Sequence, residues 1–329
     1  MSDKTRIFIA GHRGMVGSAL CWLLEKRDDV ELFTQTREEL DLTHSSEVQE
    51  YFLDNEIEQV YLAAAKVGGI QANNQFPADF IRENLEIQTS VIQAAFAAGI
   101  GRLLFLGSSC IYPREAEQPM AEEALLTGQL EPTNEAYAVA KIAGIKMCEA
   151  YRRQHGCDFR SIMPTKLYGP NDNFDPESSH VLAALLLKAH YAKLGKKKVM
   201  EVWGSGQPRR EFLHVDDMAS ACVHLMDLPE KKYWAAASPH CSHINAGTGR
   251  DLTIAELAEL ALSVVGSEAK LKFDTSKPDG SPQKLLDISR ITDLGWEAKI
   301  RLAEGMRSTY EWMLANWDLV EGEPRQGDG

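Results

Sequence analysis

The chain has 329 residues, of which 44% are hydrophobic and 25% charged, and its formal net charge is −13. This composition is typical of a soluble globular protein that is long enough for two domains or for one domain with an added lobe. The acidic balance argues against a nucleic-acid partner, because such proteins present a basic face to phosphates. No apolar run approaches the ~20 residues of a membrane-spanning helix, and the start of the chain lacks a signal-peptide pattern.

Six cysteines are spread along the chain without any Cys-x-x-Cys pair. This pattern disfavours a disulfide framework and a zinc site, so we expect a reduced, cytoplasmic protein without a metal. His214 with Asp216 and Asp217 is the one group that suggests a metal ligand set, and we interpret it as structural.

The chain opens with the pattern of a nucleotide-binding unit. Residues 6–10 form the continuous apolar run of a buried parallel strand, and residues 18–24 have a helical pattern. The turn between them consists of Gly11, His12, Arg13, Gly14, Met15, Val16 and Gly17. In such a turn the first glycine allows the bend, the second admits a pyrophosphate, and the third lets helix and strand pack closely. The spacing departs from G-x-G-x-x-G, so a glycine-rich turn without a ligand remains the alternative.

Residues 31–36 predict a second strand, whose end normally contacts the adenosine ribose. An acidic residue there would accept a hydrogen bond from the 2′-hydroxyl group and select NAD. This chain has Arg37 instead, and Arg13 lies in the glycine turn. Two guanidinium groups suit a 2′-phosphate, so we predict NADP(H) as the cofactor. The alternative is that Arg37 is a solvated loop residue.

Further elements alternate along the chain. Helical patterns follow at 42–55, 84–98, 137–155, 180–193, 215–228, 254–265 and 302–317, and strand patterns at 60–65, 102–106, 158–165, 199–203, 211–214 and 242–246. Repeated strand–helix alternation predicts an α/β fold with a doubly wound parallel sheet. We expect residues 1–171 and 212–249 to form the NADP-binding Rossmann domain, 172–211 and 250–320 a smaller α+β substrate domain, and 321–329 a disordered tail.

Polar residues at the end of the fourth strand and on the next helix are placed for chemistry. Ser108 and Cys110 follow the strand, where ligands bind in parallel sheets. Tyr137 and Lys141 are four residues apart and therefore share one helix face. An ammonium group beside a tyrosine lowers the phenol pKa from about 10 and makes it a better proton donor. By itself this pair is a weak signal, because helices contain many tyrosines and lysines.

Together, the glycine turn, Ser108 and the Tyr137–Lys141 pair resemble the extended short-chain dehydrogenase/reductase family, from about residue 7 to 312. In that family a serine, a tyrosine and a lysine form the catalytic set, which the resemblance assigns to these three residues. The resemblance also implies cofactor contacts from Leu106, Gly107, Ser108, Lys141, Pro164, Thr165, Lys166, Leu167 and His180. At Lys166 relatives often have a neutral polar residue, so the role of its ammonium group stays open.

Stretches 107–113, 131–137, 167–174, 202–206, 210–217 and 277–280 resemble one branch of that family. Its members epimerise GDP-4-keto-6-deoxy-D-mannose at C3 and C5 and then reduce the C4 ketone with NADPH. Epimerisation needs a base and an acid with pKa values near neutral, and the resemblance assigns them to Cys110 and His180, in either order. Ser108 and Tyr137 would donate hydrogen bonds to the C4 oxygen, and Tyr137 would protonate the alkoxide.

The same resemblance implies substrate contacts from Lys188, Trp203, Arg210 and Asp279, and a homodimer formed through the helices at 84–98 and 137–155. Simpler interpretations remain: Cys110 as a small buried apolar residue, His180 as a surface histidine and Trp203 as a core residue. The rival functions are a nucleotide-sugar 4-epimerase that retains NAD and a non-catalytic NADP-binding protein.

Overall fold

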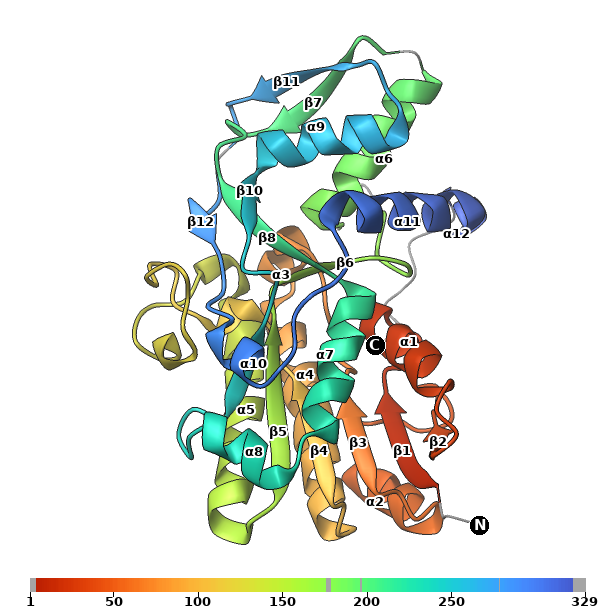
Figure 1. Cartoon of the computed structure of the whole chain (residues 1–329), viewed down its shortest axis with the longest axis vertical. Helices are drawn as coiled ribbons and strands as arrows, with labels where there is room; N and C mark the ends of the chain where they lie inside the picture. Colours follow the sequence, from red (N-terminus) through yellow and green to blue (C-terminus); the bar gives the residue numbers. More distant parts are fainter. Residues whose placement is uncertain (1–3, 176–178, 196, 278, 322–329) are drawn as a thin grey trace.

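Six parallel strands form the larger sheet, in the lower half of Figure 1. The computed structural model describes residues 4–175, 179–195, 197–277 and 279–321. Across the sheet the strands are β2 (Val30–Phe33), β1 (Thr5–Ala10), β3 (Gln59–Leu62), β4 (Arg102–Leu106), β5 (Asp158–Pro164) and β9 (His243–Ala246). The order reverses between β1 and β3, which creates the crevice where open parallel sheets bind ligands. The predicted doubly wound parallel fold is confirmed.

Helices cover both faces of this sheet. Alternate residues of β1 enter different apolar clusters: Ile7 and Ile9 pack on one face, and Phe8 and Ala10 on the other. The first face is covered by α1 (Met15–Leu24) and α7 (Val215–Asp227), and the second by α2 (Ser45–Asp54), α4 (Pro77–Ala97) and α5 (Glu135–His155). Burial on both faces explains why the strands are continuously apolar in sequence.

A second layered unit occupies the upper half of Figure 1 and has its own apolar cluster. It contains α6 (Val181–Leu194), β7 (Val199–Trp203), α9 (Ile254–Val265), β11 (Lys270–Asp274), α11 (Leu302–Ala315) and α12 (Trp317–Glu321). Shorter helices elsewhere are α3 (Ile70–Gln75), α8 (Glu230–Ala236) and α10 (Ser289–Asp293). No helix in the described ranges is both long enough and apolar enough to cross a membrane.

A small sheet lies between the two units and is built around β8 (Arg209–His214). β8 pairs with β6 (Lys166–Tyr168), β10 (Asp251–Thr253) and β12 (Gln283–Lys284). Glu211, which is fully buried on β8, accepts hydrogen bonds from the backbone N–H groups of Thr248, Gly249 and Leu286. This carboxylate joins β8 to the segments around residues 248–249 and 286.

Several element boundaries differ from the predicted ones. α4 begins at Pro77 and not at residue 84, because a proline at the first helical position is compatible with a helix start. β6, β10 and β12 have two or three residues each, too few for a strand pattern in the sequence. Of the tail predicted to be disordered, residues 322–329 lie outside the described residues.

Candidate active site

The glycine turn has the geometry of an anion-binding turn. Gly11 has φ +81°, and a Cβ atom there would lie 2.8 Å from the backbone of Ala64, so β1 and β3 meet closely at the crevice. A Cβ atom on Gly17 would lie 2.0 Å from the Gly11 carbonyl oxygen, whereas one on Gly14 would meet nothing nearer than 3.4 Å. Gly14 caps α1 without any side-chain hydrogen bond, so the first N–H groups of the helix stay available to an anion.

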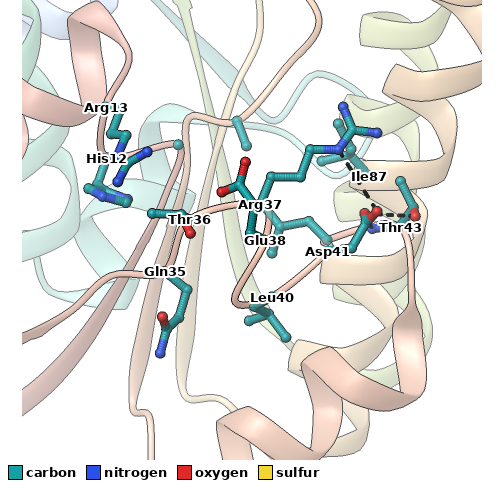
Figure 2. Close-up of a pocket in the computed structure, with 13 residues that line it drawn as sticks. His12, Arg13, Gln35, Thr36, Arg37, Glu38, Leu40, Asp41, Thr43 and Ile87 are labelled. Atoms are coloured by element: carbon teal, nitrogen blue, oxygen red, sulfur yellow. Dashed lines mark hydrogen bonds and ion pairs between the residues drawn. The ribbon is translucent and has the colours of Figure 1, made fainter. Parts of the chain in front are cut away.

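A pocket opens beside this turn, and both predicted arginines line it (Figure 2). Its walls are formed by Gly11, His12, Arg13, Gln35, Thr36, Arg37, Glu38, Leu40, Asp41, Leu42, Thr43, Ala64 and Ile87. Arg37 is half-exposed and turns toward Asp41, with 3.8 Å between Nε and Oδ2, while Arg13 lies beside His12. Such a solvated ion pair is weak, so the Arg37 guanidinium can exchange its partner for a phosphate. Glu38 adds a carboxylate to the same pocket.

Ser108, Tyr137 and Lys141 come together where β4 ends against α5. The Lys141 ammonium is buried, donates a hydrogen bond to the Leu106 carbonyl oxygen at 2.9 Å and lies 5.9 Å from the centre of the Tyr137 ring. Burial lowers the pKa of Lys141 to about 8. The Ser108 hydroxyl acts on the Tyr137 phenol and favours the phenolate. The predicted trio therefore forms one connected group.

One expectation about this trio is wrong. The pKa of Tyr137 is raised, first by burial and then by Cys110, and is not lowered as the Tyr–Lys spacing suggested. The physical reason is desolvation: the half-buried phenol loses part of its contact with water, while the ammonium group of Lys141 is directed to the Leu106 carbonyl oxygen. The Tyr137 phenol is therefore protonated in neutral solution.

Cys110 lies in the short 3-10 turn that Ser108 caps. Its backbone N–H points to the Ser108 hydroxyl, 3.5 Å away, and its side chain is buried. Burial raises the pKa of the thiol, while the Ser108 hydroxyl and the ammonium groups of Lys284, Lys141 and Lys166 oppose that rise. The Ser108 hydroxyl thus acts on both the Cys110 thiol and the Tyr137 phenol.

His180 immediately precedes α6 and is exposed. Desolvation, and secondarily the Lys166 ammonium, lower the pKa of its imidazole. Lys166 starts β6, follows Pro164 and Thr165 at the end of β5, and is half-buried.

The residues predicted for substrate binding lie around the end of β7. Trp203 is 63% exposed, so it is no core residue, and its ring carries the ammonium groups of Lys188 at 5.1 Å and Lys277 at 5.5 Å. Asp279 accepts hydrogen bonds from the N–H and hydroxyl groups of Ser205. Arg210, on β8, is partly buried. An exposed indole flanked by two cations can stack on an electron-rich ring next to phosphate groups.

His214 and its acidic neighbours have structural roles. The Nδ1 atom of His214 accepts a hydrogen bond from the Asp216 N–H group and caps α7. The Asp217 carboxylate accepts hydrogen bonds from the N–H groups of Lys299 and Ile300. The Asp217 carboxylate is thus engaged by backbone N–H groups, and the Nδ1 atom of His214 is engaged in capping α7.

Known proteins resemble this chain over nearly its full length. Residues 7–236 match the model of the NAD dependent epimerase/dehydratase family. A GDP-L-fucose synthase from Escherichia coli (strain K12) is 57% identical over 320 residues, which are 97% of this chain and 100% of that protein. The chain belongs to the GDP-L-fucose synthase family.

Other members and relatives of the GDP-L-fucose synthase family agree. GDP-L-fucose synthase 1 from Arabidopsis thaliana is 55% identical over 96% of this chain and 95% of that protein. A solved GDP-D-glycero-L-gluco-heptose synthase from Campylobacter jejuni, determined in the presence of NADPH, is 38% identical with a TM-score of 0.89, covering 95% and 99% of the two chains. The predicted family and the predicted enzyme class, an epimerase and reductase, are confirmed.

The sequence analysis did not single out two cationic residues, Lys277 and Lys284. Lys277 stands in the recognised stretch 277–280, and its contact with Trp203 depends on the pairing of β7 with β11. Lys284 lies on a strand of two residues, so no local pattern pointed to it. Both reach the site through strand pairing between distant segments, which the sequence alone does not reveal.

Proposed function

We propose that this chain converts GDP-4-keto-6-deoxy-D-mannose to GDP-L-fucose by epimerising the hexose at C3 and C5 and reducing its C4 ketone with NADPH. The proposal rests on one observation: the Ser108 hydroxyl acts both on Tyr137, which belongs to the reductase group, and on Cys110, which belongs to the epimerase group. Ser108 contacts the hydride-transfer residue Tyr137 and also the thiol of Cys110. A hexose whose C4 ketone is bound at Ser108 is therefore close to the residues proposed for both reactions.

The reductase half uses the Ser108–Tyr137–Lys141 group. The glycine turn and the arginine pocket fit a dinucleotide with a 2′-phosphate, because the turn leaves room at Gly14 and the pocket supplies Arg13 and Arg37. When bound, NADPH supplies the hydride. Tyr137 then donates its proton to the C4 oxygen, and Lys141 stabilises the negative charge that develops on the phenol.

The epimerase half uses Cys110 and His180, which approach the hexose from β4 and α6. Removing a proton next to the ketone produces an enolate, whose oxygen accepts hydrogen bonds from Ser108 and Tyr137. A proton returned on the opposite face of the ring inverts the carbon. Two separate groups suit this inversion, since one group alone returns the proton to the face it left.

Trp203, Lys188, Arg210 and Asp279 form a binding surface for the nucleotide diphosphate. The exposed indole of Trp203 offers a stacking platform for a purine base. Lys188 and Arg210 neutralise the diphosphate, and the Asp279 carboxylate accepts hydrogen bonds from ribose hydroxyl or base N–H groups.

The decisive test incubates the purified protein with GDP-4-keto-6-deoxy-D-mannose and NADPH in D2O. We expect GDP-L-fucose that carries deuterium at C3 and C5 and a hydride from NADPH at C4. A protein that releases tightly bound NAD and turns over without NADPH is instead a 4-epimerase. Binding of NADPH without any turnover would indicate a non-catalytic protein.

The proposal includes a homodimer in the cytoplasm. α4 and α5 pack against each other, and the surface of this helix pair includes exposed apolar side chains, among them Phe96 at 38% and Val139 at 39% exposed. Burying this surface against a second copy removes apolar area from water. All six cysteines are free, as expected in a reducing compartment. Light scattering that gives the mass of one chain at micromolar concentration would refute the dimer.

A further inference from the structure

A buried amide on the edge strand of the large sheet joins segments that lie far apart in the sequence. Asn245 is on β9 and is fully buried. Its backbone N–H donates to Glu122 at 3.0 Å, and its side-chain N–H groups donate to the carbonyl oxygens of Met120 and Asp287 at 3.0 and 3.1 Å. Its Oδ1 atom accepts a hydrogen bond from the Tyr112 hydroxyl. Both ends of this side-chain amide are therefore paired, as burial of an amide requires.

His243 fixes the direction of the bond between Tyr112 and Asn245. It lies two residues before Asn245, so both side chains project from the same face of β9. Its Nε2 atom is 3.1 Å from the Tyr112 hydroxyl oxygen. Burial lowers the pKa of His243 to about 3, so the ring is neutral. Because the Tyr112 proton goes to the Asn245 oxygen, the phenol oxygen accepts from the Nε2–H group of His243. Two buried side chains thus hold the Tyr112 hydroxyl.

Tyr112 ends the turn that carries two residues of the candidate site. The turn is the 3-10 helix Ser109–Ile111, with Ser108 before it and Tyr112 after it. Two of its internal hydrogen bonds are 3.5 Å long, from the Cys110 N–H to the Ser108 hydroxyl and from the Tyr112 N–H to the Ser109 carbonyl oxygen. Distances near 2.9 Å are usual for such bonds, so these two are weak. The position of the turn therefore depends on the side chains that anchor it, and the buried phenol of Tyr112 is one of them.

The same amide holds the segment that continues from β12. The Met120 N–H donates to the Leu285 carbonyl oxygen at 2.8 Å, and the Met120 carbonyl oxygen accepts from the Asp287 N–H at 2.9 Å. Leu285 directly follows Lys284, which pairs with Arg210 in the small sheet. Asn245 closes this arrangement from the side of the large sheet, through the carbonyl oxygens of Met120 and Asp287.

Resting on the proposed function, we propose that Tyr112 and Asn245 are positioning residues that set the distance between the hexose end and the nucleotide end of the substrate site. The hydroxyl of Tyr112 ties the turn at 108–112 to Asn245. The amide of Asn245 ties the same point to the segment beside Arg210. A substrate whose diphosphate is bound at Arg210 presents its C4 ketone to Ser108 only while this distance is kept. A misplacement of about 1 Å can cost about 100-fold in rate.

The test compares Tyr112→Phe with a matched control, Tyr233→Phe. Tyr233, on α8, is also buried, and its hydroxyl donates to the Ser242 carbonyl oxygen and accepts from the Ser161 N–H. Each variant removes one buried hydroxyl and keeps the ring, so both should lower Tm to a similar extent. Only Tyr112→Phe is expected to lower kcat with GDP-4-keto-6-deoxy-D-mannose and NADPH, by about tenfold, with KM within about twofold because Asn245 still holds the nucleotide side.

Hydrogen exchange and a double variant give two further readouts. Amide exchange over residues 107–113 should be about tenfold faster in Tyr112→Phe and unchanged in Tyr233→Phe. Asn245→Ala should lower kcat and also raise KM for the GDP-sugar, and adding Tyr112→Phe to it should lower kcat by less than about twofold more, because the hydroxyl has already lost its acceptor. If Asn245→Ala does not fold, the two tyrosine variants decide the question alone.

Equal kcat values in the two tyrosine variants, or unchanged exchange over residues 107–113 in Tyr112→Phe, would overturn the inference, because the hydroxyl would then contribute stability only. If the wild-type protein does not act on the keto-sugar, the proposed function fails. The exchange rates still show in that case whether the Tyr112 hydroxyl holds the turn.

Discussion

Two alanine substitutions in the glycine turn separate cofactor binding from folding. Gly14→Ala and Gly17→Ala add the same methyl group three residues apart. At Gly14 the new Cβ atom lies 3.4 Å from its nearest neighbour, at the edge of ordinary contact, and the backbone φ of −73° suits alanine. At Gly17 it lies 2.0 Å from the backbone oxygen of Gly11, so the turn must open by about 1.4 Å to restore the 3.4 Å of ordinary contact.

Because these two distances differ, we expect the two substitutions to change the free energy of unfolding by different amounts. Gly17→Ala should lower the free energy of unfolding by about 3 kcal/mol or more, because backbone atoms cannot rotate away from the methyl group. Gly14→Ala should cost only about 0.5 kcal/mol, as expected for replacing a glycine N-cap. It should nevertheless weaken NADPH binding about 10- to 100-fold, because the methyl group separates the phosphates from one or two N–H donors.

The assays are thermal unfolding and a fluorescence titration with NADPH. For Gly17→Ala we expect a fall in Tm of roughly 5–10 °C. Wild-type NADPH affinity in Gly14→Ala would show that the pyrophosphate does not lie over this turn. An unchanged Tm in Gly17→Ala would refute the close approach of α1 to the Gly11 carbonyl.

Four further changes test other parts of the site. Cys110→Ser should slow deuterium uptake at C3 and C5 by about 100-fold and leave hydride transfer to the epimerised keto-sugar within about threefold, and equal losses would contradict separate roles. Arg37→Ala should raise KM for NADPH about tenfold without changing kcat, since this half-exposed group pairs only with Asp41 at the pocket rim and is proposed to bind the 2′-phosphate; an unchanged KM would leave Arg37 as a solvated loop residue. Because Lys141 has a pKa of about 8, its charge is present below and lost above that value, so the pH–rate profile for reduction should fall above about pH 8 in the wild type, and Lys141→Arg should remove this fall. Glu211→Leu should destabilise the fold by about 3 kcal/mol, because three backbone N–H groups, that of Leu286 fully buried, lose their acceptor, and a Tm close to that of the wild type would refute this role of the carboxylate.

The large sheet was predictable because its signals are local. Buried parallel strands appear as continuous apolar runs, and Gly11 and Gly17 of the turn have steric reasons that hold for any chain of this fold. Ser108, Cys110, Tyr137 and Lys141 follow such local features, so their juxtaposition could be expected from the order of strands and helices. The structure brings these four side chains into one group.

The substrate side was less predictable because distant segments build it. β6, β10 and β12 are two or three residues long and are held on β8 by pairing and by the buried Glu211 carboxylate. Lys284 reaches the cleft only through this pairing. The sign of the pKa shift at Tyr137 also depends on burial by the whole structure, which helical spacing does not contain.

The most direct test of the central claim is the isotopic composition of the product formed in D2O from GDP-4-keto-6-deoxy-D-mannose and NADPH. If one site performs both epimerisation and reduction, the product is GDP-L-fucose with deuterium at C3 and C5 and protium from NADPH at C4. A C4-reduced GDP-sugar that keeps protium at C3 and C5 would identify a reductase without epimerase activity and would contradict the roles given to Cys110 and His180.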